Sequence, residues 1–475
     1  MAVLAQPIPA ESGTRNLRLP GAILLISCYE LGHQPLGAAL PLAFLDRAGF
    51  APAAMDIAVE PLDPARIARA GLVGIAVPMH TALRLGVGVA EAVRRINPAA
   101  RICFYGLYAA LNAEYLLDHG ADWCIGGEYE GPLVALAEAL DAGPPGLVPG
   151  VISRGEPALP YLGRLPFPVP ERGALPPLER YARLEVAEER RVVGYVEASR
   201  GCKHLCTHCP IPPVYGGRFF ALPRDVVQED IRRQVEAGAQ HMTFGDPDFL
   251  NGPTHALRVA RDLHREFPEV TFDFTAKVEH ILKHRELFPE LRRLGCLFMV
   301  SAVESLSPTV LRILEKDHTR EDVEQALAIM RDAGIAMRPT WVPFTPWTRR
   351  EDYLEILDFV DASDLVDHVD PVQFSIRLLV PPGSYLLHHP EMHPHLGALD
   401  QAAFTYRWNH PDPEMDALQR RAAALVEAGV RESEDPALTF ARLHALARGG
   451  DPAAAAPRPA PARPRAPRLT EPWFC

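Results

Sequence analysis

Residues 199–210 read Ser-Arg-Gly-Cys-Lys-His-Leu-Cys-Thr-His-Cys-Pro, and the spacing of their cysteines decides how the rest of the chain is interpreted. Cys202, Cys206 and Cys209 form a C-x3-C-x2-C pattern directly after an apolar, β-rich run at 192–199. Thiolates are preferred ligands of iron–sulfur clusters and of zinc. A cubane cluster has one ligand site at each of its irons, so three cysteines leave one iron corner open for a small chelating molecule.

Zinc is the alternative occupant of this loop. A structural zinc ion takes four ligands, commonly from two pairs of cysteines. The chain has no second closely spaced pair, and His204 and His208 are interleaved with the cysteines, which leaves little freedom for a closed tetrahedron. A zinc-stabilised binding protein without catalytic activity is therefore the alternative function, and three thiols without any metal is the remaining interpretation.

Composition limits the other classes. The 475 residues carry a formal charge of −12, so a nucleic-acid backbone would be repelled on average. We find no apolar run long enough to span a bilayer, and the first twenty residues do not have the pattern of a secretory signal. We therefore expect a cytoplasmic protein with neither membrane nor nucleic acid as a partner. In that compartment the eight cysteines are thiols or metal ligands before they are disulfides.

Apolar strand-like runs alternate with helix-like stretches on both sides of a proline-rich segment. This alternation predicts parallel sheets, because parallel neighbours need crossover connections. The predicted fold is α/β: an N-terminal doubly wound, Rossmann-like sheet followed by a partial (βα)6 barrel of the TIM type. The predicted strands of the sheet are 22–27, 55–60, 72–78, 102–106 and 123–127, and those of the barrel are 192–199, 241–246, 270–277, 296–304, 336–344 and 371–380.

Domain boundaries follow from the same pattern. The functional face of each sheet is expected at the carboxyl ends of its strands. The tail after Gly450 is rich in Ala, Pro and Arg and is expected to be disordered. The predicted segments are an N-terminal extension 1–19, a Rossmann-like domain 20–145, a proline-rich linker 146–190, a partial barrel 191–400, a helical region 401–447 and a disordered tail 448–475.

The cysteine loop and the six βα units around it resemble the radical S-adenosylmethionine (SAM) superfamily, over about residues 190–400. The family usually has an aromatic or apolar residue before its third cysteine, and here that residue is His208. The resemblance implies that the three cysteines hold a 4Fe–4S cluster whose fourth iron binds SAM. It implies reductive cleavage of SAM to methionine and a 5′-deoxyadenosyl radical, which abstracts hydrogen from a substrate. A flavodoxin or ferredoxin would supply the electron, and the substrate is an unknown small molecule or peptide.

The same resemblance suggests which residues bind SAM. Gly245 and Asp246 end the second barrel strand, where the family meets the SAM amino group. Glu304 and Ser305 end the fourth strand, opposite the ribose or carboxylate. Lys277 ends the third strand and, like Arg338 and Glu279, is a candidate for a carboxylate contact. The alternatives are a turn at 245–248, a helix N-cap at 305–307 and surface ion pairs.

The N-terminal domain resembles the cobalamin-binding domains of many radical SAM enzymes. Gly126 and Gly127 follow its fifth strand, and the resemblance implies that they let a corrin tail approach the backbone. The Asp-x-His-x-x-Gly motif that supplies a cobalt ligand is absent. His33 follows the first strand, but the aspartate before it is missing and the glycine after it comes one residue late. The resemblance of this domain to cobalamin-binding domains makes cobalamin-dependent methyl transfer one expected reaction. The alternative is a domain that keeps the fold for docking a partner.

The chain ends Leu-Thr-Glu-Pro-Trp-Phe-Cys475. This end resembles a narrower group of radical SAM proteins, whose tail reads Cys, then Cys or selenocysteine, then Ala-Glu-Pro. The hypothesis is that the stop after Cys475 is a UGA codon for selenocysteine. The alternative is a genuine terminal cysteine.

Overall fold

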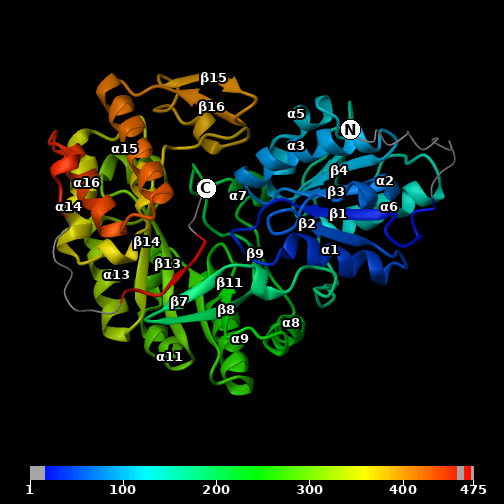
Figure 1. Ribbon diagram of the computed structural model, residues 1–475, viewed down its shortest axis with the longest axis horizontal. Helices are drawn as coiled ribbons and strands as arrows, with labels where there is room; N and C mark the ends of the chain where they lie inside the picture. The colour runs from blue at the N-terminus through cyan, green and yellow to red at the C-terminus, as the bar shows by residue number, and fades with distance from the viewer. Residues whose placement is uncertain (1–15, 457–464, 472–475) are drawn as a thin grey trace, which may run out of the picture. The chain divides into compact units, whose positions relative to one another are not determined.

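The computed structural model describes residues 16–456 and 465–471. The chain divides into two compact units, each with its own sheet. The first unit comprises the residues up to Glu30 together with Gly37–Leu175, and the second comprises Leu31–Leu36 and the chain from Pro176 onward. Figure 1 shows the first unit in blue to blue-green and the second in green to red, apart from its blue residues 31–36. No helix of the described residues is long and apolar enough to cross a membrane.

The first unit is a doubly wound sheet with the strand order β2-β1-β3-β4-β5-β6. The first five strands are parallel and β6 is antiparallel to β5. Strands β1 and β3 are buried along their whole length, as a sheet covered by helices on both faces requires. The strands are β1 Ile23–Ser27, β2 Ala53–Asp56, β3 Leu72–Ala76, β4 Arg101–Tyr105, β5 Trp123–Ile125 and β6 Val151–Ile152, and the helices are α1 Leu36–Arg47, α2 Pro64–Arg69, α3 His80–Ile96, α4 Leu107–Leu111, α5 Ala113–Asp118 and α6 Glu130–Ala142.

The strand predicted at 55–60 begins two residues earlier and ends at Asp56. The reason is local: the Asp56 carboxylate accepts a hydrogen bond from the backbone N–H of Ala58, which turns the chain out of the sheet. The other four predicted strands of this unit each coincide with an observed strand to within about two residues at either end. The predicted fold class is confirmed.

The second unit is a curled sheet with the order β14-β13-β12-β11-β8-β7-β17. Five neighbouring strands, β8 and β11–β14, are parallel, and helices follow them as in a partial barrel. We call the six strands from β14 to β7 the half barrel. Its strands are β7 Arg183–Val186, β8 Glu189–Val196, β11 His241–Phe244, β12 Thr271–Thr275, β13 Cys296–Glu304 and β14 Ala336–Trp341, and β17 is Arg468–Leu469.

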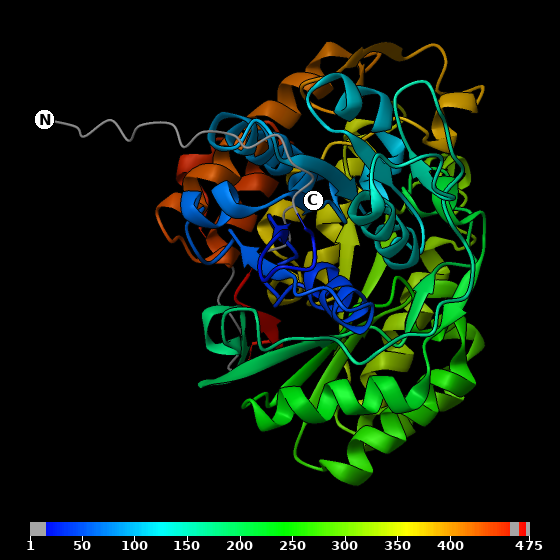
Figure 2. The same ribbon diagram turned by 90° about the vertical axis from the view of Figure 1, so that its right-hand side faces the viewer.

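Helices cover the outside of the half barrel, as Figure 2 shows in green below the sheet. Helix α13 shows how the sequence sets such an element: Thr319 and Asp322 form a capping box at its start, and Gly334 ends it in the left-handed conformation. The helices are α8 Arg224–Glu236, α9 Pro253–Glu266, α10 Val278–Lys283, α11 Phe288–Arg293, α12 Pro308–Ile313, α13 Arg320–Ala333 and α14 Arg350–Ala362.

The predicted sixth barrel strand at 371–380 is wrong. Pro371–Ser375 is a 3-10 helix, and the following residues make only one isolated parallel bridge, Phe344 to Arg377. Prolines at 371, 381 and 382 remove backbone donors on both sides, so no strand ladder can extend there. At the opposite edge of the sheet, the antiparallel strand β7 is added beside β8.

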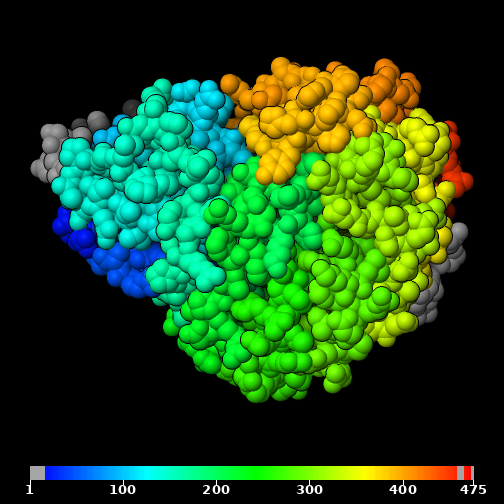
Figure 3. Space-filling model, turned by 180° about the vertical axis from the view of Figure 1, so that it is seen from behind, coloured from blue at the N-terminus to red at the C-terminus, as the bar shows by residue number. Residues whose placement is uncertain are grey.

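The C-terminal part of this unit contains the predicted helices α15 Pro413–Arg431 and α16 Pro436–Ala447. A hairpin of β15 Leu396–Asp400 and β16 Thr405–Trp408 precedes them, so the predicted helical region 401–447 is wrong at its start, where β16 lies. Figure 3 shows the hairpin region in orange at the edge of the green outer surface of the same unit. The expectation of a disordered tail is wrong for residues 465–471, because they contain strand β17.

Candidate active site

The three cysteines lie in a loop that begins at the carboxyl end of the first barrel strand. Strand β9 (Ser199–Gly201) leads into it and pairs antiparallel with β10 (Phe219–Ala221). Gly201 has φ +71°, and a Cβ there would collide with the carbonyl of Arg218 and the ring of Tyr215, so only glycine fits. Cys202 and Cys206 are buried and Cys209 is partly buried.

The thiols lie close enough to affect one another's protonation. The pKa of Cys209 is raised to about 12, chiefly by burial and also by the neighbouring Cys206 and Cys202, against the lowering effect of a hydrogen bond from the backbone of Ile211. Burial likewise raises the pKa of Cys202, opposed by the Asn251 side chain. Burial and the neighbouring thiols thus disfavour the thiolate forms, and a bound cation would offset both effects, so this donor set fits a thiolate-bound metal cluster.

Asp248 anchors the cysteine loop to two other elements. Its carboxylate accepts hydrogen bonds from the backbone N–H groups of Leu250 (2.9 Å) and Lys277 (3.1 Å) and from Nδ1 of His280 (2.9 Å). His204 Nε2, in the cysteine loop, lies 3.5 Å from Asp248 Oδ2, the oxygen that also bonds to His280. Burial raises the pKa of Asp248, but His204 and His280 outweigh it and hold the pKa below its usual value. The three side chains could also ligate a cation.

Lys277 and Asn251 make the other contacts of the loop. Lys277 is buried, and its Nζ lies 3.3 Å from His204 Nδ1, 3.8 Å from Glu279 and 3.6 Å from Asp317. Asn251 donates its amide to the Cys202 sulfur at 3.6 Å and accepts from the Lys203 backbone at 3.2 Å. The predicted residue Lys277 therefore lies at the site, where its ammonium group contacts His204 of the cysteine loop.

Glu304 forms the centre of a buried charge cluster on the other side of the loop. Its Oε1 lies 3.3 Å from Nζ of Lys316 and 3.5 Å from Nε2 of His208. Burial raises the pKa of Glu304, but Lys316 and His208 outweigh burial and lower it to about 2. Glu304 also has φ +67°, an uncommon conformation for a carboxylate residue that ends a strand. The predicted residue Glu304 is thus ionised, buried and next to the cysteine loop.

Asp246 ties the end of β11 to the start of the cysteine loop. Its two oxygens accept hydrogen bonds from the Ala198 backbone N–H (2.9 Å) and from the Ser199 hydroxyl. Burial raises the pKa of Asp246 to about 7, against the lowering effect of these two donors. Each carboxylate oxygen can accept a second hydrogen bond, so this anchoring role leaves room for a ligand amine. Gly245 is required because Tyr195 occupies the space of its missing side chain.

Ser305 follows Glu304 and accepts a hydrogen bond from the backbone N–H of Ser307 at 3.1 Å. Ser307 stands at the N-cap position of α12, but its side chain makes no cap bond. The Ser307 hydroxyl therefore does not cap α12. The Ser305 hydroxyl instead accepts from the backbone of the N-cap residue. Arg338 pairs with Asp370 at 2.9 Å and makes no hydrogen bond or ion pair with the cysteine loop among the described residues.

In the first unit, the space beside the two glycines is filled by the protein itself. A Cβ at Gly126 would collide with Ala110, and one at Gly127 (φ +74°) would collide with the carbonyl of Tyr161. Tyr161 also bonds to the backbone on both sides of this pair. The glycines are therefore explained by packing, and they do not form an open cradle for a corrin tail.

His33, the other residue considered for cobalamin, belongs to the second unit and stacks on Tyr195 with ring centroids 4.7 Å apart. This contact does not identify it as a cobalt ligand.

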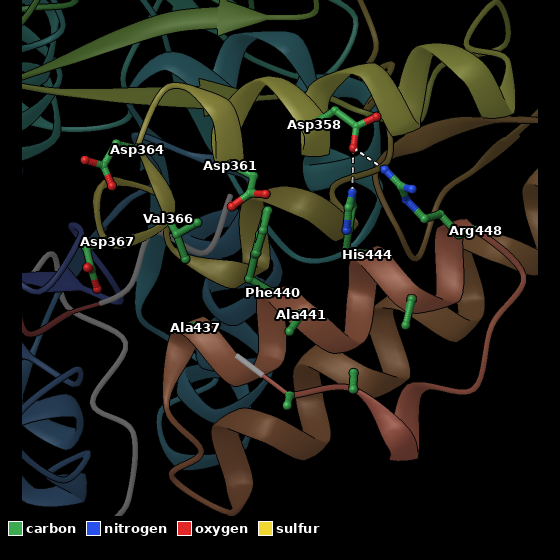
Figure 4. Close-up of a pocket in the computed structure, with 13 residues that line it drawn as sticks. Asp358, Asp361, Asp364, Val366, Asp367, Ala437, Phe440, Ala441, His444 and Arg448 are labelled. Atoms are coloured by element: carbon green, nitrogen blue, oxygen red, sulfur yellow. Dashed lines mark hydrogen bonds and ion pairs between the residues drawn. The ribbon is translucent and has the colours of Figure 1, made fainter. Parts of the chain in front are cut away.

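A cavity of about 710 Å³ lies between α14 and α16, away from the cysteine loop. Figure 4 shows Asp358 there, bonded to His444 and Arg448, with Asp361, Asp364 and Asp367 nearby. An acidic rim alone does not identify a ligand, and we assign no function to this cavity.

Sequence reasoning missed Asp248, Asn251, His280 and Lys316. The stretch Asp248-Phe-Leu-Asn251 follows the second barrel strand by a few residues, which was the available signal for the first two. Lys316 lies twelve residues after Glu304, and only the fold of α12 brings the two side chains together.

A sequence model of the Radical SAM superfamily matches residues 196–360, which include the three cysteines and strands β11–β14. The chain thus contains a radical SAM superfamily domain. It is 26% identical to the hopanoid C-3 methylase of Methylococcus capsulatus over 356 residues, which cover 72% of this chain and 68% of the methylase. It is 25% identical to the ribosomal protein uS12 methylthiotransferase RimO of Azorhizobium caulinodans, over 37% of this chain and 42% of that protein.

Two solved structures share the fold. The cobalamin-dependent SAM radical enzyme OxsB has a TM-score of 0.68 at 15% identity and covers 90% of this chain and 68% of its own. The radical SAM methyltransferase TsrM of Kitasatospora setae has a TM-score of 0.59 at 18% identity, covering 72% of this chain and 73% of its own.

Proposed function

We propose that this radical SAM enzyme holds a 4Fe–4S cluster on Cys202, Cys206 and Cys209 and cleaves SAM reductively. The observation that carries the proposal is the arrangement of three crowded thiols at the carboxyl end of β8, inside the matched superfamily domain. Three sulfur ligands suit a cluster with one open iron, whereas a closed tetrahedral zinc site needs a fourth ligand.

A bound cluster would supply the single electron that cleaves SAM. The remaining work is done by this chain's own side chains. Asn251 holds the loop by a hydrogen bond to the Cys202 sulfur, and Asp248 lies 3.5 Å from His204 of the loop. Their packing keeps water from the thiols, which protects a reduced site from side reactions.

The charged residues around the loop suit the polar ends of SAM. Lys277 and Lys316 are buried cations at either side, and cations of this kind bind a carboxylate. Asp246 and Glu304 are buried carboxylates that can accept hydrogen bonds from an amine or a ribose hydroxyl. We propose Gly245, Asp246, Lys277, Glu304 and Ser305 as the SAM-binding residues.

We propose methyl transfer as the reaction class that follows SAM cleavage. The support is the methylase and methyltransferase character of the similar proteins. Cobalamin is the group that such a reaction could use, since OxsB and TsrM are described with it bound. The residues named from the sequence do not form a corrin cradle here, so we derive no step through cobalamin.

The first experiment purifies the protein without oxygen and measures iron, sulfide and zinc. About four irons and four sulfides per chain are expected, because a cubane contains that many. One zinc with no iron, or a colourless protein after reconstitution, would support the zinc-stabilised alternative instead.

The second experiment replaces one ligand. Cys206→Ala is expected to abolish 5′-deoxyadenosine formation from SAM in the presence of dithionite. Cys296→Ala is the matched control, because Cys296 is equally buried in the same unit but lies at the start of β13. Full SAM cleavage by Cys206→Ala would reject the assignment.

Corrin absorbance after incubation with hydroxocobalamin and gel filtration tests the cobalamin proposal separately. A flavodoxin or ferredoxin is the proposed physiological reductant.

A further inference from the structure

The described end of the chain returns to the half barrel as an added strand. Arg468 and Leu469 pair antiparallel with Glu185 and Leu184 of β7. The backbone N–H of Thr470 donates to the Arg183 carbonyl at 2.8 Å, and the Arg183 N–H donates to the Thr470 hydroxyl at 2.9 Å. This ladder covers the free edge of β7, which is a position where an unpaired strand would otherwise expose its backbone groups.

The same segment also contacts the opposite edge of the sheet. Arg338 lies on β14, at the far end of the strand order, and its Nη1 donates to the Pro467 carbonyl at 3.3 Å. A second nitrogen of the same guanidinium donates to Asp370 at 2.9 Å. The residues from Pro467 to Leu469 therefore touch both the first and the last strand of the curled sheet.

Leu469 packs inside the curl. It contacts the cluster made by Leu184, Val193, Phe298 and Val300. Val193 is on β8 and Phe298 is on β13, and two other strands separate these in the sheet, so they meet only across its concave face. The tail leucine thus fills the inside of the half barrel at its open side.

The added strand runs toward the functional edge. Strand β17 is antiparallel to β7, which is antiparallel to β8, so β17 runs in the direction of the barrel strands. Beyond it, Glu471 lies so close to Gly32 that a Cβ there would be 2.7 Å from that of Glu471. The next residue, His33, stacks on Tyr195, whose ring lies against Gly245.

We propose that residues 467–471 are a closing strand that seals the open side of the half barrel and keeps water out of its interior during SAM cleavage. The catalytic part of this inference rests on the proposed function, whereas the docking of the strand does not. An open half barrel admits water to its interior, and water exclusion is needed for radical chemistry.

Two truncations test the inference. A chain that ends at Arg465 loses the closing strand, and a chain that ends at Glu471 keeps every contact described above. Hydrogen exchange of the β7 amides should accelerate at least tenfold in the first truncation and stay unchanged in the second. With both proteins reconstituted to the same iron content, 5′-deoxyadenosine formation should fall at least tenfold in the first and stay within twofold in the second.

A full-length pair guards against misfolding of the truncated chain. Arg338→Met removes the contact between β14 and the tail, whereas Asp370→Asn removes only its ion-pair partner. Faster exchange of residues 467–471 is expected in Arg338→Met and not in Asp370→Asn.

Unchanged β7 exchange in the chain ending at Arg465 would overturn the docking. Faster exchange with undiminished SAM cleavage would overturn the proposed role of the seal in catalysis, as would an equal loss of cleavage in both truncations. If the intact protein cleaves no SAM, the proposed function fails. The exchange of the β7 amides then still tests whether residues 467–471 dock on β7.

Discussion

Glu304 Oε1 lies 3.3 Å from Lys316 Nζ, and both side chains are buried beside the cysteine loop. A buried ion pair is costly to break on one side only, because the partner left behind is an uncompensated charge. This pair therefore makes both the stability of the second unit and the electrostatics of its loop depend on one lysine.

Lys316→Met should lower the free energy of unfolding of the second unit by about 3–5 kcal/mol, because Glu304 would remain buried without its cation. Urea denaturation followed by circular dichroism measures the loss. The double variant Glu304→Gln/Lys316→Met should recover a large part of it. A double variant as unstable as the single one would show that packing, rather than charge, explains the loss.

Asp246 predicts a pH dependence of stability. Burial raises its pKa to about 7 in the folded protein, above the ordinary 3.8. The folded state then binds the proton more tightly than the unfolded state, so this group's stabilising contribution is present below pH 4 and is lost as the pH rises through 7. Asp246→Asn should therefore weaken the decline of urea midpoints between pH 5 and 8. The exposed carboxylate variant Asp225→Asn should keep the wild-type slope, and equal slopes for all three proteins would contradict the assignment.

Asp248→Ala should destabilise the second unit by about 3–5 kcal/mol, since it leaves two backbone donors and His280 without their acceptor. Iron retained after reconstitution and gel filtration should fall with it. Asp317→Asn is the control, because that carboxylate is exposed and touches only the Lys277 ammonium among the site residues. Full iron retention in Asp248→Ala would mean that the loop forms without this anchor.

Gly127→Ala should destabilise the first unit more than Gly155→Ala. Both glycines have positive φ, +74° and +78°, but only at Gly127 would the added carbon collide with Tyr161. Both variants thus carry the strain of a positive φ, so the difference between their stability losses measures the cost of the collision. We expect that difference to be about 1–3 kcal/mol. Thermal unfolding measures it. Equal losses would indicate that the space beside Gly127 is open after all.

The sequence predicted the elements that depend on local pattern. The apolar runs that became β1, β3, β8 and β13 are long and bounded by turn residues, and the cysteine spacing located the metal loop without any structure. The failures have local or long-range causes. Prolines around 371–382 prevented the sixth strand, and the Asp56 side chain ended β2 early.

Other residues of the site could not be predicted because their partners are distant in sequence. Lys316 reaches Glu304 only through the turn of α12, and Asp248 meets His204 and His280 from three separate segments. Strand β17 shows the same limit: a composition typical of disorder contains a strand because β7 offers an unpaired edge about 280 residues away. Cys475, with the selenocysteine hypothesis, lies outside the described residues, and that hypothesis stays a prediction.

The direction of β17 has a practical consequence for anyone who handles this protein. Because the strand travels the same way as β8, an affinity tag or reporter fused directly after Glu471 would start out in the direction of the edge that holds the cysteine loop. Purification handles therefore belong at the N-terminus, and a C-terminal fusion that alters cofactor loading would reflect crowding by the fused polypeptide.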